Sequence, residues 1–184
     1  YESLQWLDQL GCKNLKTPRP LSICREQKIY CMEYVTGSPI DELVAKRRWQ
    51  ELSVACGLAG EALAAMHNQW TDRWGPFPVD EIIADIRTVS WGLASKSITQ
   101  LYSLMTNLRG KQVAFGQAYM DYKPANILYD DERIALVDPP EQHCRHGILL
   151  WDLAVFQHGL ESAFFKLQCR RPATTTRRIA DECL

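Results

Sequence analysis

Two short stretches decide the fold of this chain: residues 120–128 (MDYKPANIL) and, after a polar turn, residues 134–138 (IALVD). Asp121 is followed five positions later by Asn126, and Asp138 stands at the end of the next predicted strand. A phosphoryl-transfer site requires these residue types, because one carboxylate must face the acceptor hydroxyl while an amide oxygen and a second carboxylate hold Mg²⁺ against the triphosphate. The spacing therefore predicts Asp121 as the catalytic base and Asn126 and Asp138 as metal and nucleotide ligands.

Composition and charge limit what the chain can be. Of its 184 residues, 46% are apolar and 23% are charged, so it can bury one sizeable core as a single domain or the larger part of a two-lobed protein. Its formal net charge of -1 gives no field that would gather nucleic acid or anionic lipid. No apolar run is long enough for a membrane span. We therefore expect a small-molecule or protein partner, and neither nucleic acid nor a membrane.

The cysteines indicate the compartment. The chain has seven of them, an odd number, widely spaced and mostly set in apolar segments. This pattern favours reduced thiols over a disulfide framework and predicts a cytoplasmic protein. The chain also begins at Tyr1, inside a periodic apolar pattern, which suggests a piece of something longer.

Hydrophobic periodicity predicts the order of the elements. The pattern changes from helix to strand, then to a mostly helical block, and returns to strands around the acidic stretch. The expected elements are a helix at 4–10, a strand at 28–35, helices at 40–48 and around 52–66, a loop at 70–78, one or two helices over 79–108, a strand at 112–119, a hairpin of 126–129 with 133–137, a helix at 148–167 and a tail at 172–184.

Four stretches resemble elements of the protein-kinase-like superfamily. Residues 119–126 resemble its catalytic loop, residues 137–138 the metal-binding Asp that opens the next loop, and residues 31–35 the hinge between two lobes. Residues 150–154 (LWDLA) resemble an Asp-Leu-Ala element whose buried Asp accepts backbone N–H bonds from the catalytic loop. The resemblance implies an α+β kinase-like fold: a mostly helical large lobe with a short catalytic β-hairpin, and a remnant of the small β-lobe.

The same resemblance implies a domain plan. Residues 1–37 would be the remnant of the small, nucleotide-binding lobe plus the hinge. Residues 38–171 would form the helical large lobe, with the catalytic loop and inserted acceptor-site helices, and residues 172–184 would be a C-terminal tail.

Topology indicates the branch of the superfamily. The run Ala64-Ala65-Met66-His67 is separated from Asp121 by the helical block at 79–108. An insertion at this place resembles the aminoglycoside phosphotransferase and choline kinase group, in which it builds the acceptor pocket. The letters of residues 123–126 (KPAN) look more like a protein kinase loop, but we give topology more weight than four letters.

The resemblance also implies ligands for individual residues. ATP would place its adenine edge against the backbone C=O of Glu33 and N–H of Val35, with Met32 at the back of the pocket. Lys123 would act with Asp121 as a catalytic group by contacting the γ-phosphate, although a solvated loop lysine fits the sequence equally well.

The implied function is transfer of the γ-phosphate of ATP to a hydroxyl of a small molecule of aminoglycoside, amino alcohol or sugar type. Three acidic residues in the inserted block, Asp80, Glu81 and Asp85, could attract a cationic acceptor or simply favour a helix start. Two alternatives stay open: a catalytically inactive kinase-like binding or regulatory module, and an atypical protein kinase. They stay open because no Gly-rich loop or strand lysine precedes the hinge, and because Tyr119 stands where a His is usual.

Overall fold

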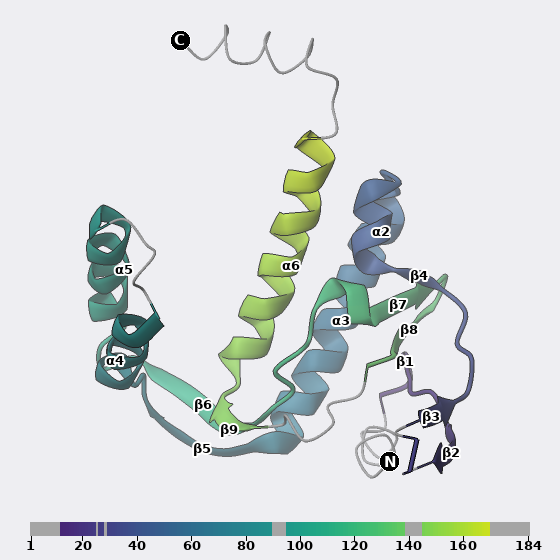
Figure 1. Ribbon diagram of the computed structural model, residues 1–184, viewed down its shortest axis with the longest axis horizontal. Helices are drawn as coiled ribbons and strands as arrows, with labels where there is room; N and C mark the ends of the chain where they lie inside the picture. The colour runs from purple at the N-terminus through teal and green to yellow at the C-terminus, as the bar shows by residue number, and fades with distance from the viewer. Residues whose placement is uncertain (1–11, 25, 28, 90–94, 139–144, 170–184) are drawn as a thin grey trace, which may run out of the picture.

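The computed structural model describes residues 12–24, 26–27, 29–89, 95–138 and 145–169 (Figure 1). The helix expected at 4–10 and the tail expected at 172–184 lie outside these residues. Within them the chain is α+β, with five helices and three small sheets. The helices are α2 (Ile40–Ala45), α3 (Trp49–Trp70), α4 (Val79–Val89), α5 (Ser95–Asn107) and α6 (Leu150–Cys169), with a 3₁₀ turn, η1 (Pro124–Asn126).

Helix α3 is the centre of the core. Its buried residues recur every three or four positions, so they form one apolar stripe along the helix. This stripe packs against α2, the catalytic hairpin and Phe156 of α6 in a single hydrophobic cluster. The buried residues of α3 are Leu52, Ala55, Ala59, Ala62, Leu63, Met66 and Trp70. The predicted periodicity is confirmed here, and the helix extends to Trp70.

The predicted hairpin is confirmed in β7 (Ile127–Asp130) and β8 (Arg133–Leu136), which pair antiparallel. Apolar side chains of both strands point into the core, and the turn between them is exposed. Strand β1 (Leu15–Lys16) runs parallel to β8, and β4 (Ser38–Pro39) pairs antiparallel with β7, which gives the sheet order β1-β8-β7-β4. Through this sheet the hairpin connects β1 and β4, which precede the long helices, to the loop that contains Asp121 and Asn126.

Two stretches differ from the sequence prediction. The loop expected at 70–78 contains a strand, β5 (Thr71–Pro76), and the residues before α6 form a second one, β9 (Arg145–Ile148). Both pair antiparallel with β6 (Gln112–Ala118), one on each edge. Both edges of a central strand need hydrogen-bond partners, and β5 and β9 supply them for β6. Pairing with β6 makes these two segments strands although their own residues, which include Trp, Pro and His, give no clear strand pattern. The predicted start of the last helix at 148 was therefore too early.

The segment before the hinge also contains an unpredicted strand. This strand, β2 (Pro20–Cys24), pairs antiparallel with β3 (Ile29–Met32). The strand expected at 28–35 is shorter in the structure, where β3 ends at Met32. The one or two helices expected over 79–108 are two, α4 and α5. No helix among the described residues is both long and apolar enough to cross a membrane.

Candidate active site

The acidic residues predicted from the sequence come together between η1 and the end of β8. The Nδ2 atom of Asn126 lies 2.8 Å from Oδ2 of Asp121 and 3.4 Å from Oδ2 of Asp138. Asn126 is buried, whereas Asp121 is half-buried and Asp138 is exposed. The amide therefore links two carboxylates that are seventeen positions apart in the chain and that are both accessible to solvent.

The backbone around Asp121 is held by local hydrogen bonds. Met120 has a φ of 69°, a left-handed conformation that is unusual for a residue with a side chain and turns the chain sharply before Asp121. The N–H of Lys123 then donates to the C=O of Asp121 at 2.8 Å, and the N–H of Val137 donates to the C=O of Asn126 at 3.1 Å. These bonds fix the loop against the hairpin.

Asp152 holds this loop from behind, as the resemblance implied. Its side chain has no exposed surface. Its Oδ2 accepts the N–H of Tyr119 at 2.8 Å, and its Oδ1 accepts the N–H of Met120 at 2.6 Å. The Nε2 atom of His67, near the end of α3, lies 3.1 Å from the same Oδ2. A buried carboxylate with this many partners positions the left-handed turn rather than reacting itself.

Two buried tyrosines support the loop and were not assigned a role from the sequence. The hydroxyl of Tyr119 donates to the C=O of Asp138 at 2.5 Å, so it helps to place the backbone of the second acid. The hydroxyl of Tyr122 donates to the C=O of Ala59 in α3 at 2.7 Å, and burial raises the pKa of this phenol, which keeps it a donor. The only sequence signal was their position on either side of Asp121.

Lys123 lies beside the predicted base. Its Nζ atom is 2.8 Å from Oδ2 of Asp121, with both side chains roughly half exposed. The ammonium and the carboxylate are both accessible to solvent and form an ion pair. The structure thus brings Lys123 into the cluster, while its contact with a phosphate stays a prediction.

The predicted hinge follows β3 and leads to β4. The N–H of Glu33 donates to the C=O of Arg19 at 2.8 Å, and a hydrogen bond from the Lys16 ammonium lowers the pKa of the Glu33 carboxyl. Within the described part of the chain, neither the C=O of Glu33 nor the N–H of Val35 has a hydrogen-bond partner. These two backbone groups, which are expected to bind the adenine edge, are therefore available for a ligand. Met32, beside them, is half-buried.

The hinge ends at a glycine that joins it to the hairpin. Gly37 has a φ of 134°, and a Cβ there would stand 2.9 Å from the carbonyl oxygen of Tyr129, so only glycine fits this approach. Next to it, the hydroxyl of Thr36 donates to Oδ2 of Asp130 at 2.8 Å. The hinge and the strand that follows Asn126 are thereby held together.

The donor set fits a magnesium ion shared with a nucleotide. Among the described residues, Oδ1 of Asn126 has no hydrogen-bond partner, and the Asp138 carboxylate is exposed. No group of three or more His, Cys, Asp or Glu side chains that could hold a metal by itself is found in the described ranges. Mg²⁺ is commonly held by one or two protein oxygens together with substrate phosphates and water, which is what Asn126 and Asp138 could provide.

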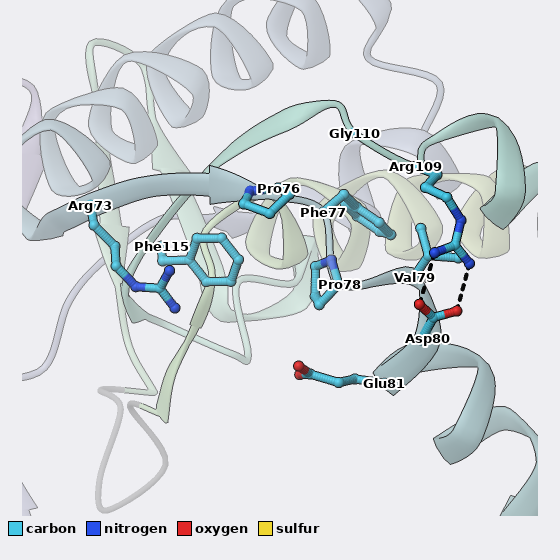
Figure 2. Close-up of a pocket in the computed structure, with 10 residues that line it drawn as sticks. All are labelled: Arg73, Pro76, Phe77, Pro78, Val79, Asp80, Glu81, Arg109, Gly110 and Phe115. Carbon is cyan, nitrogen blue, oxygen red and sulfur yellow. Dashed lines mark hydrogen bonds and ion pairs between the residues drawn. The ribbon is translucent and has the colours of Figure 1, made fainter.

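A separate pocket of about 390 Å³ lies where β5 meets α4 (Figure 2). Arg109 binds Asp80 through two hydrogen bonds of 2.8 and 2.5 Å, so this carboxylate of the inserted block is neutralised. Arg73 lies over the ring of Phe115, with its guanidinium carbon 4.3 Å from the ring centroid, while Glu81 projects from the start of α4. The pocket is therefore of mixed charge rather than acidic, and its lining does not include Asp121.

Comparisons with known proteins bear on the family and the fold of the chain. A sequence profile described as the Phosphotransferase enzyme family matches residues 1–178. Two crystal forms of a glucosamine kinase are similar in structure, with TM-scores of 0.59 and 0.51 at 16% sequence identity. Each match covers 93% of this chain and 51% of the kinase, so the chain spans about half the length of that protein. A search of curated protein sequences gave no significant match. The predicted α+β kinase-like fold is confirmed.

Proposed function

Since this chain belongs to the phosphotransferase enzyme family, we propose that its acidic loop transfers the γ-phosphate of ATP to a hydroxyl group of a small molecule. The observation that carries the proposal is the convergence of Asp121, Asn126 and Asp138 at one partly open place, with Asn126 bridging the two carboxylates. These are the base and metal ligands that such a transfer needs.

Asp121 acts first in this proposal. Its carboxylate accepts a hydrogen bond from the acceptor hydroxyl and finally takes its proton, while the hydroxyl oxygen forms a bond to the γ-phosphorus in line with the bond that breaks to the β-phosphate. ADP leaves with the bridging oxygen. Lys123, which lies 2.8 Å from Asp121, would balance negative charge on the transferred group.

Asn126 and Asp138 would hold Mg²⁺, which supplies positive charge against the phosphate oxygens of the nucleotide. The backbone of Glu33 and Val35 would bind the adenine edge, with Met32 at the back of the adenine pocket. In this plan residues 1–37 contribute to nucleotide binding, residues 38–171 carry the catalytic loop and residues 172–184 are a tail.

For the acceptor we propose a sugar-type hydroxyl, and an amino sugar in particular. The glucosamine kinase to which the fold is similar acts on an amino sugar according to its name, which supports this class. The neutralisation of Asp80 by Arg109 argues against a strongly acidic acceptor pocket of the kind that a polycationic antibiotic requires. We place the protein in the cytoplasm, because the described cysteines are free thiols.

The test is a Mg-ATP transfer assay with labelled γ-phosphate against glucosamine, an aminoglycoside, choline and a generic protein substrate. Asp121→Asn is expected to lower transfer by roughly 10²–10⁴-fold, because the general base is lost, while ATP affinity changes little. Glu132→Gln, in the exposed hairpin turn, is the matched control and should leave both unchanged. Wild-type transfer by Asp121→Asn would refute the base assignment, and labelling of the protein substrate alone would favour an atypical protein kinase.

A further inference from the structure

A second pocket lies behind the catalytic loop, apart from the acidic cluster. Its volume is about 460 Å³, and it is an open hollow bordered by the C-terminal half of α3, the paired strands β5 and β6, and the first turn of α6. Ligand pockets in proteins commonly have volumes of a few hundred Å³. Four elements border this hollow, and its volume is large enough for a small molecule.

The lining of this pocket is apolar and carries no charge. Trp74 and Val113 come from the strands, and Leu63, Leu150 and Leu153 come from the helices. No Asp, Glu, Lys or Arg side chain lines the pocket among the described residues, and the polar side chains are those of His67 and Gln112. A charged ligand would lose its hydration there without a partner, whereas an uncharged molecule would lose little.

The pocket has an open, solvent-exposed side. Gly60, which lines it, is exposed, and an added Cβ there would meet nothing within 4 Å. Three large side chains at the rim remain well exposed, with 69% of the surface of Trp74, 50% of Leu150 and 48% of Leu153 accessible. A molecule that entered this space would remove apolar surface from water on several sides at once, which favours binding.

His67 connects this pocket to the active site. Its side chain lines the pocket, and its Nε2 lies 3.1 Å from Oδ2 of Asp152. The same carboxylate accepts the N–H groups of Tyr119 and Met120, immediately before Asp121. A ligand that packs on the imidazole excludes water from the His67–Asp152 contact, and a drier surrounding strengthens such a polar contact.

We propose that this pocket is a binding site for a small, uncharged, largely apolar ring compound with one hydrogen-bonding group, and that its occupancy is coupled to the catalytic loop through His67 and Asp152. The hydrogen-bonding group would meet His67 or Gln112, which are the polar side chains available to it. Binding and loop protection do not depend on the proposed transfer reaction, so they can be tested whether or not that reaction occurs.

Binding is tested with indole, which is uncharged, aromatic and carries a single N–H donor, by saturation-transfer-difference NMR on the indole protons. The wild-type chain is expected to bind it, whereas Gly60→Leu fills the pocket and should weaken binding by about tenfold or more, equivalent to roughly 1.4 kcal/mol. Gly57→Leu is the matched control, because Gly57 lies on the same helix, also has open space around it and does not line the pocket.

Ala64→Leu, on the same wall, gives a second blocking variant should Gly60→Leu fold poorly. Equal indole binding by the wild-type chain and both blocking variants, or no binding by the wild-type chain, would overturn the site.

Coupling is tested by hydrogen exchange of the Tyr119 and Met120 amides. Saturating indole should slow their exchange in the wild-type chain and in Gly57→Leu, and should leave it unchanged in Gly60→Leu. His67→Phe keeps an aromatic ring at the pocket wall but removes the bond to Asp152, so it should bind indole without slowing these amides. Equal slowing in His67→Phe, or no slowing in the wild-type chain, would overturn the coupling.

Discussion

Among single residues, one buried carboxylate organises the candidate site. Asp152 is fully buried and accepts two consecutive backbone N–H groups of the loop that leads to Asp121. The left-handed Met120 is stable only because such bonds hold it, since this conformation costs free energy in residues other than glycine. The position of Asp121 therefore depends on a residue thirty-one positions further along the chain.

We predict that Asp152→Asn destabilises the protein by about 1–3 kcal/mol, because the amide NH₂ group cannot accept one of the two N–H donors. Urea unfolding measures this free energy. Asp72→Asn is the control: Asp72 pairs with His146 on the surface, where an ion pair contributes about 0–1 kcal/mol. Equal effects of the two substitutions would contradict the organising role of Asp152.

At the scale of elements, the packing of α6 on η1 joins the structural acid to the catalytic loop. Gly159 of α6 faces the ring of Pro124, and a Cβ at this position would overlap the proline Cδ. Glycine inside a helix normally lowers stability relative to alanine. Its presence here is explained by the close approach of the two elements.

Gly159→Ala is therefore expected to destabilise the protein by about 1–3 kcal/mol, in spite of the better helix propensity of alanine. Gly57→Ala in α3, where a Cβ meets nothing within 4 Å, should instead stabilise it by about 0.5–1 kcal/mol. Thermal and urea unfolding of both variants measure the difference. If Gly159→Ala were the more stable protein, the close packing of α6 on Pro124 would be wrong.

The ion pair between α4 and the loop after α5 predicts a pH dependence. The hydrogen bonds and charge of Arg109 lower the pKa of the Asp80 carboxyl from its ordinary value of 3.8. Because the folded-state pKa lies below the unfolded one, the pair stabilises the fold above pH 3.8 and this contribution disappears as the pH falls through the folded-state pKa. An NMR titration of Asp80 should show the lowered value, and Arg109→Gln should return it to the ordinary range.

At the scale of the whole molecule, stability is expected to be uneven. Helices α4 and α5 stand apart from α3 and α6 and are joined to them through the arm of β5 and β6 (Figure 1). The main hydrophobic cluster contains residues of α2, α3, the hairpin and α6, and among the described side chains none from α4 or α5. Segments with few contacts to a core open at lower free energy than the core itself.

Hydrogen exchange should therefore be faster in residues 79–85 of α4 than in residues 52–66 of α3. Mass spectrometry of peptides from both segments measures this without ligands. Equal protection of the two helices would indicate that α4 is anchored as firmly as the core.

Local patterns in the sequence are enough to specify several features of this protein. The apolar stripe of α3, the hairpin around its polar turn, and the spacing from Asp121 to Asn126 and Asp138 can all be recognised within about twenty residues. Such patterns are decided by the period of a helix or strand, so they do not depend on distant partners. Three of the site residues predicted on this basis lie together in the structure.

Contacts between groups far apart in the sequence depend on the tertiary structure. Strands β5 and β9 form because β6 lies between them, the N–H groups of the catalytic loop find their acceptor in Asp152, and Tyr119 reaches the carbonyl of Asp138. Arg109 neutralises Asp80 in the same way, across twenty-nine positions. These contacts join segments that are far apart in the sequence. They stabilise the fold only after the core has brought the segments together, and for this reason no local sequence pattern can predict them.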